Sequence, residues 1–153
     1  MKLQGNHQIN AKASKIWDLL MDPIMLAKIT PGIDRLELIG EDHYNAVAEV
    51  RIGPVKGQFT GEVEVKDKEA PSTFRLLIDQ KSRVGNAKAN VVIHLNELAG
   101  EISEVNFTGD VRLSGMLASM GQRVIGGVVS MLTRQFFDAL ENEVRSEEIS
   151  TDD

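Results

Sequence analysis

The sequence feature that most constrains the fold is a run of alternating apolar and polar residues from Asp34 to Leu113. Alternation with period two is typical of strands that bury one face, and short turns between such strands join antiparallel neighbours. Turn-forming residues divide the run into six segments, at positions 40–42, 53–54, 70–72, 84–86 and 99–101. With a similar pattern in residues 1–9, the run predicts seven antiparallel strands whose apolar face needs a cover.

The candidate cover is the one long helical pattern of the chain, which extends from Gly115 to Val144. Two short helices are expected near Ser14 and after Asp22, where a proline follows a capping residue. This order of elements looks like the α+β helix-grip fold, in which a curved seven-stranded sheet wraps round its C-terminal helix. The apolar side of the long helix, at about 100° per residue, is predicted to contain Leu117, Gly121, Val124, Ile125, Val128, Leu132, Phe136 and Ala139.

The size of the chain, 153 residues, suits a single domain, which we place at residues 1–144. Residues 145–153 contain too few apolar side chains to order themselves, and we expect a disordered acidic tail there. The net charge of −6 disfavours a nucleic-acid partner, because nucleic-acid binders cluster Lys and Arg. The absence of cysteine excludes disulfides and thiolate metal sites, and it fits a cytoplasmic location.

Small residues on the predicted inner face of the sheet indicate space between the sheet and the helix. In a curved sheet, inward glycines also permit bends and close contacts, so this alternative stays open. A space lined by apolar side chains would accept an apolar guest. The predicted ligand-binding residues are His7, Tyr44, Ala48, Gly57, Phe59, Gly61, Val91, Phe107, Gly109, Leu117, Gly121, Val124, Ile125 and Val128.

Two adjacent glycines, Gly126 and Gly127, lie inside the predicted helix. Each costs about 0.5–1 kcal/mol relative to alanine in a helix interior. They indicate either a bend or close approach of another backbone, or a weak point that lets the helix open as a lid over a ligand.

No catalytic residue, metal site or cofactor motif can be identified in the sequence. The three histidines, His7, His43 and His94, are far apart, and only His7 is predicted to point inward. A lone inward histidine more commonly forms a core hydrogen bond than it acts as a base or binds a ligand. We therefore expect a binding protein rather than an enzyme.

Three segments carry a resemblance to a known family. These are Ile29-Thr30-Pro31-Gly32-Ile33, the segment Ile52-Gly53-Pro54-Val55-Lys56-Gly57, and Gly121-Gln122-Arg123-Val124-Ile125 followed by Gln135-Phe136-Phe137. Over about residues 1–144, the sequence resembles the CoxG family of carbon monoxide dehydrogenase subunits, which belongs to the START-like, polyketide-cyclase-like superfamily. The family pattern has cysteine where Ile33 stands, so any role of that thiol does not carry over.

The resemblance implies an accessory protein of a carbon monoxide dehydrogenase-type molybdenum hydroxylase. It also implies a lipid or isoprenoid quinone as the bound molecule, and transient contact with the inner face of the membrane. Family members often have a hydrophobic C-terminal anchor, whereas this chain ends in Ser-Thr-Asp-Asp, so we expect a carrier without stable anchoring. Two alternatives remain: an enzyme of the polyketide cyclase type acting on an aromatic or polyketide-like substrate, and a protein-docking module.

Overall fold

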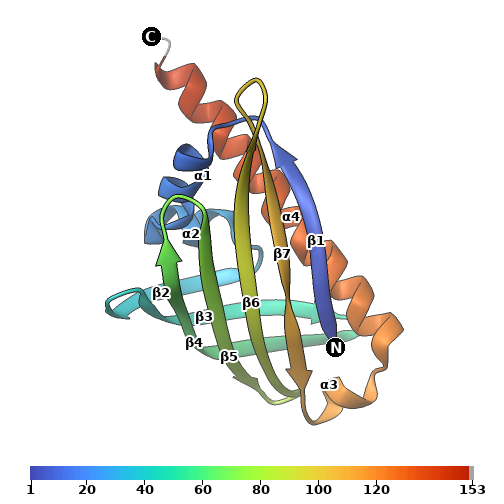
Figure 1. The fold of residues 1–153 in the computed structure, drawn as a ribbon. Helices are drawn as coiled ribbons and strands as arrows, with labels where there is room; N and C mark the ends of the chain where they lie inside the picture. Colours follow the sequence, from blue (N-terminus) through green and yellow to red (C-terminus); the bar gives the residue numbers. More distant parts are fainter. Residues whose placement is uncertain (152–153) are drawn as a thin grey trace.

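A computed structural model describes residues 1–151, except for the side chains of Val55 and residues 148–151 (Figure 1). The strands are β1 (Lys2–Ile9), β2 (Ile33–Gly40), β3 (His43–Ile52), β4 (Val55–Glu69), β5 (Thr73–Ser82), β6 (Gly85–Leu98) and β7 (Ile102–Leu113). The helices are α1 (Ala13–Leu20), α2 (Pro23–Ile29), α3 (Met116–Ser119) and α4 (Gln122–Thr151).

The seven strands form one sheet in the order β1-β7-β6-β5-β4-β3-β2, and every neighbouring pair is antiparallel. The sheet curves, and α4 runs along one of its faces from α3 to the C-terminal end of the chain (Figure 1). The predicted helix-grip architecture is confirmed. One helix can cover seven strands because the sheet bends round it.

The two helices that connect β1 to β2, α1 and α2, lie where the sequence predicts short helices. Asp22 caps α2 by accepting a hydrogen bond from the backbone N–H of Ile24 at 3.0 Å, and Pro23 occupies the first helical position. At the start of α1, the backbone N–H of Ala13 donates to Glu97 of β6 at 3.1 Å. The contact with Glu97 attaches the start of α1 to β6.

The long C-terminal helix differs from its prediction at its beginning. It is interrupted at Gly121, whose φ of +85° lies in the left-handed region that glycine adopts without strain. On the predicted apolar side, Leu117 and Ile125 are buried, and Val128, Phe136 and Ala139 pack against the core, so most of that side is confirmed. Phe137, Leu140 and Val144 of α4 are also buried, although they were not predicted to be. The inward placement of Val124 was wrong, because this residue is 42% exposed and lies about 100° round the helix from Ile125.

The C-terminal end of α4 also differs from its prediction. The helix continues through Thr151, so residues 145–151 are helical rather than a disordered tail, and residues 152–153 lie outside the described residues. Lys15 of α1 forms an ion pair with Glu147, and Arg145 lies 3.7 Å from Glu141 one turn earlier. Both contacts favour helix in this acidic segment.

The buried apolar side chains form two separate clusters on the covered face of the sheet. The first lies under α1, α2 and the C-terminal half of α4, and it contains Trp17, Phe74, Val105 and Leu140. The second lies under the N-terminal part of α4, and it consists of Ile52, Phe59, Leu117 and Ile125 with partly buried neighbours. The space between these clusters is the part of the core that concerns function.

Candidate functional site

The strand register places two adjacent rows of residues between the clusters, and we call these twelve residues the central band. Side chains in each row point to the covered face, because they alternate with the charged residues of the outer face. The first row is Leu38, Tyr44, Val63, Ile78, Ala89 and Val111. The second row is Leu36, Ala46, Gly61, Gln80, Ala87 and Leu113.

Most of the central band is not filled by core packing. Of its twelve members, only Ala89 and Leu113 pack against a cluster. Val63, Ile78 and Ala89 belong to the three middle strands of the band and face the helix, yet they are only partly buried. Ile78 and Ala89 also line a pocket on the outer face, so Val63, which does not, carries the indication that solvent reaches the covered face.

Gly126 gives an independent sign of open space under α4. Gly126, Thr133 and Leu140 are spaced seven residues apart, so they lie on the same side of α4. Leu140 is fully buried against the first cluster. Gly126 is itself partly buried, yet a Cβ atom built on it would have no neighbour within 4 Å apart from its own helix. The pair Gly126 and Gly127 thus leaves α4 continuous, and Gly126 adds room between α4 and the sheet.

A pocket of about 240 Å³ opens at the β7 end of the central band. It lies between the last residues of β7, the first residue of the chain and the break that separates α3 from α4. Apart from Gly121 and Gln122 its lining residues are apolar, and they include two members of the band. The lining residues are Met1, Val111, Leu113, Leu117, Ala118, Gly121, Gln122 and Ile125.

One polar side chain of the central band lacks a partner. The amide nitrogen Nε2 of Gln80 is buried and forms no hydrogen bond with any described residue. Gln80 follows Ile78 by two positions, so the alternation of β5 places it on the inner face. The ligand-binding residues predicted from the sequence do not include Gln80. The alternation itself was the signal that could have found Gln80.

Tyr44 supplies the second polar group of the central band. The residue is 3% exposed. Burial, reinforced by the nearby Asp42 carboxylate, raises the pKa of the Tyr44 phenol above its ordinary value of 10.0. The hydroxyl therefore stays protonated at neutral pH and can donate a hydrogen bond.

His7 lies outside the central band, under the C-terminal half of α4. Its ring stacks on the ring of Phe137 with a centroid distance of 4.2 Å. Phe107 also stacks on Phe137, with a centroid distance of 5.9 Å. His7 forms no hydrogen bond with the described residues, so the core hydrogen bond expected from the sequence is absent. The ring contact with Phe137 takes its place. No carboxylate among the described residues orients the ring, so the geometry of a general base is missing.

The inward glycines serve close packing rather than empty space. A Cβ atom on Gly61 would lie 1.9 Å from the carbonyl oxygen of Asp79, and one on Gly109 would lie 2.2 Å from that of Asn90. At Gly5, the ring of Phe107 occupies the corresponding position, and at Gly57 the ring of Phe59 does so. The sequence inference that these glycines leave a void is corrected here, and the alternative of close contacts holds.

Most of the other predicted ligand-binding residues lie in the pocket, in the central band or in the walls beside the band. Leu117, Gly121 and Ile125 line the pocket, and Tyr44 and Gly61 belong to the central band. Val91 and Phe107 belong to the first cluster, and Phe59 and Val128 to the second, so these four build the walls on either side of the band. Ala48 is partly buried beside Phe59, and Val124 points to solvent.

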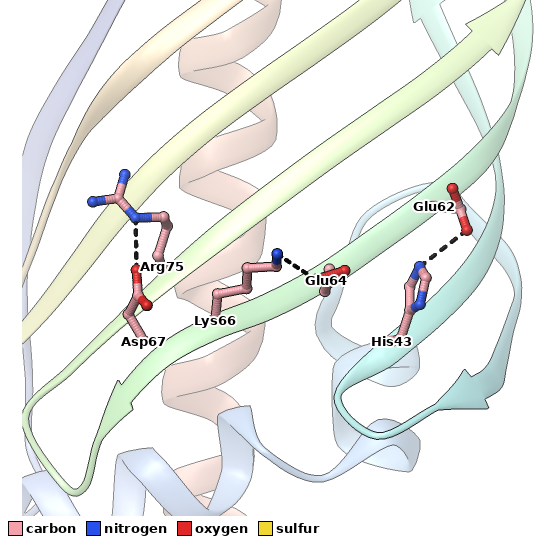
Figure 2. Close-up of polar contacts among 6 residues, drawn as sticks. All are labelled: His43, Glu62, Glu64, Lys66, Asp67 and Arg75. Carbon is pink, nitrogen blue, oxygen red and sulfur yellow. Dashed lines mark hydrogen bonds and ion pairs between the residues drawn. The ribbon is translucent and has the colours of Figure 1, made fainter.

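A larger pocket, of about 450 Å³, lies on the opposite, outer face of the sheet and is lined mainly by charged residues of β3–β7. Figure 2 shows part of this face, with α4 behind the sheet and a 3.0 Å contact between His43 and Glu62. Lys66 pairs with Glu64 and Arg75 with Asp67, both at 3.1 Å. Such solvated charges gain nothing from burying an apolar molecule, so the smaller inner pocket is the candidate site.

Two features that are absent from the described residues bear on other functions. No group of three or more His, Asp or Glu side chains there is arranged to hold a metal ion. Within residues 1–151, no helix combines the length and the apolar character needed to cross a bilayer.

Comparison with known proteins agrees with the fold and adds a family. The chain is similar to a conserved protein from Geobacillus kaustophilus, with 32% identity, a TM-score of 0.92, and coverage of 95% of this chain and 96% of the other. It has the fold of a START superfamily protein from Mycobacterium smegmatis, with 13% identity, a TM-score of 0.75, and coverage of 95% and 97%.

The fold is also that of the Zhui aromatase/cyclase from Streptomyces sp. R1128, at 13% identity, a TM-score of 0.72, and coverage of 95% and 93%. Comparison with curated proteins gave no match. The sequence profile of the CoxG family of carbon monoxide dehydrogenase subunits matches residues 5–145, which is nearly the whole chain. The chain therefore belongs to the CoxG family of carbon monoxide dehydrogenase subunits.

Proposed function

We propose that this protein binds an apolar small molecule, a lipid or an isoprenoid quinone, between the sheet and α4. The ligand enters at the pocket between β7 and the α3–α4 break and extends along the central band. The observations that support this most are the partial burial of Val63 on the covered face and the open space beside Gly126 of α4. An apolar guest would fill this space and exclude the water that reaches it.

The size of the pocket fits part of such a ligand. Its 240 Å³ is just below the range of about 300–1,000 Å³ that is typical of small-molecule sites. A ring or a chain end would therefore occupy the pocket, while the rest of the molecule lies along the band. Burial of about 300 Å² of apolar ligand surface would contribute about 7 kcal/mol before the entropy cost of binding.

The family name supports a physiological setting for this binding. A carrier that takes up a lipophilic quinone could act as an accessory to a carbon monoxide dehydrogenase-type molybdenum hydroxylase, with transient contact at the membrane surface. A protein of this kind needs an enclosed apolar site and no catalytic group. The two rows of the central band contain no carboxylate or histidine, and Tyr44 is their one titratable residue, which favours a carrier over a polyketide cyclase-type enzyme.

The experiment that tests this proposal is native mass spectrometry of the purified protein before and after extraction with organic solvent. We expect an additional mass that disappears on extraction and is recovered when a lipid extract or an isoprenoid quinone is added back. The bound form should also unfold at a higher temperature, because a ligand that binds only the folded state stabilises it. If no lipophile co-purifies, and none that is added raises the unfolding temperature, the carrier function is wrong.

A further inference from the structure

We infer that Gln80 anchors the polar group of the ligand, and that this group is a neutral carbonyl or similar acceptor oxygen. The inference rests on the proposed function, since it names the chemistry that the same site recognises. Gln80 is the one polar side chain of the central band with a buried donor that lacks a partner among the described residues. A buried amide without a partner is costly, and a ligand oxygen would remove this cost on binding.

The strand neighbours of Gln80 offer its amide no side-chain acceptor. Gly61 is paired with it across β4 and Ala87 across β6, and neither has a side chain that reaches over a glutamine. Gly61 cannot be replaced by a larger residue, because the Asp79 carbonyl oxygen occupies the position of its Cβ atom. This backbone contact therefore keeps the position opposite Gln80 on β4 free of a side chain.

The charge of the surroundings limits the ligand further. No lysine, arginine or histidine belongs to the two rows of the band, so a bound carboxylate would lose its hydration without gaining a counter-ion. A ketone, quinone or ester oxygen accepts a hydrogen bond from the amide at no such cost. The site should therefore discriminate against lipophilic acids, including fatty acids.

The test uses two ligands of nearly equal shape, 2-acetylnaphthalene and 2-ethylnaphthalene, which differ by a carbonyl in place of a methylene group. Delipidated protein is titrated with each, and the ratio of the two dissociation constants measures recognition of the oxygen. We expect the wild type to prefer the ketone by about tenfold, the size of one well-made hydrogen bond. It should bind 2-naphthoate more weakly than either.

The variant is Gln80→Met, which keeps the length of the side chain and removes its donors. It should bind both neutral ligands with a ratio near one, and its unfolding temperature should be equal to or above that of the wild type, because an unpartnered buried amide is lost. The control is Gln58→Met, which changes an exposed glutamine on the outer face of β4 and should keep the wild-type ratio.

The outcomes separate the inference from the proposed function. If both neutral ligands bind the wild type and Gln80→Met with the same ratio, or if 2-naphthoate binds best, the role of Gln80 is wrong while the apolar site stands. If neither ligand nor a lipid extract binds the wild type, the site itself is wrong and the inference fails with it.

Discussion

Adjacent residues of one helix can face different surroundings, and Gly126 and Gly127 are such a pair. Both lie in the interior of α4, and neither would place a Cβ atom within 4 Å of a neighbour outside its helix. Gly126 is partly buried on the side of the sheet, whereas Gly127 is exposed. The open space beside Gly126 is therefore part of the proposed site, and that beside Gly127 is solvent.

We predict that Gly126→Leu and Gly127→Leu each stabilise the protein by about 0.5–1 kcal/mol, because leucine has the higher helix propensity. Only Gly126→Leu should weaken binding of 2-acetylnaphthalene, by tenfold or more, since its side chain fills space that the ligand needs. Urea unfolding measures the first effect, and titration with the ligand measures the second. Equal affinities in the two variants would show that the ligand does not bind beneath α4.

The buried phenol of Tyr44 predicts a pH dependence of stability. Its pKa is raised in the folded protein, mainly by burial, so the unfolded chain loses the phenol proton first as pH rises. The stabilisation is therefore complete below pH 10.0, the ordinary pKa of tyrosine, and is lost above it. Tyr44 is the only tyrosine of the chain, so the ultraviolet absorbance of phenolate reports on this residue alone.

We predict that this absorbance rises only above pH 10.0 in the folded protein, and that unfolding in urea returns the midpoint to the ordinary value. Tyr44→Phe should retain more of its unfolding free energy at high pH than the wild type does. A phenol that titrates at the same pH in both states would mean that Tyr44 is not buried in solution.

The inward position of a single residue could be predicted where it lies in a clear alternation of apolar and polar residues. The inward position of Tyr44 follows from the pattern of β3 alone. Gln80 and Gly61 required the structure, because the first breaks the apolar pattern and the second owes its role to a carbonyl oxygen of the neighbouring strand. A sequence pattern does not contain a contact of this kind.

At the scale of elements, the strands were predicted well and the last helix less well. Strands are bounded by turns that carry their own residue signals, so their order and alternation follow directly from the sequence. The apolar side of α4 was predicted correctly at Ile125, Val128, Phe136 and Ala139. The break at Gly121 and the exposure of Val124 were not predicted.

The burial of Leu140 and the exposure of Val124 predict different losses of stability when these two side chains of α4 are shortened to alanine. Leu140 is fully buried in the first cluster, so Leu140→Ala should destabilise the protein by about 2–5 kcal/mol. Val124 is 42% exposed, and Val124→Ala should change stability by less than about 0.5 kcal/mol. Both values come from urea unfolding of the delipidated protein. A larger loss for Val124→Ala would restore the inward position that was predicted for this residue.

For the molecule as a whole, the sequence predicted a curved sheet gripping a helix, and it also predicted that the core between them is incomplete. The location of the incomplete part was not predictable, because it depends on strand register and on the gap between two packed clusters. The register places Val63, Ile78 and Ala89 in one row between these clusters. Packing in these two clusters stabilises both ends of the covered face, and the proposed function places the ligand between them.

The most direct test of an internal site is the position of a bound ligand in solution. Intermolecular nuclear Overhauser effects can be measured between 2-acetylnaphthalene and the isoleucine methyl groups of isotope-labelled protein. A ligand between the sheet and α4 should show contacts to Ile78 of the central band and Ile125 of the pocket. Contacts only to Ile24 and Ile39, which are 77% and 50% exposed, would contradict an internal site, as would the absence of any contact to the inner face.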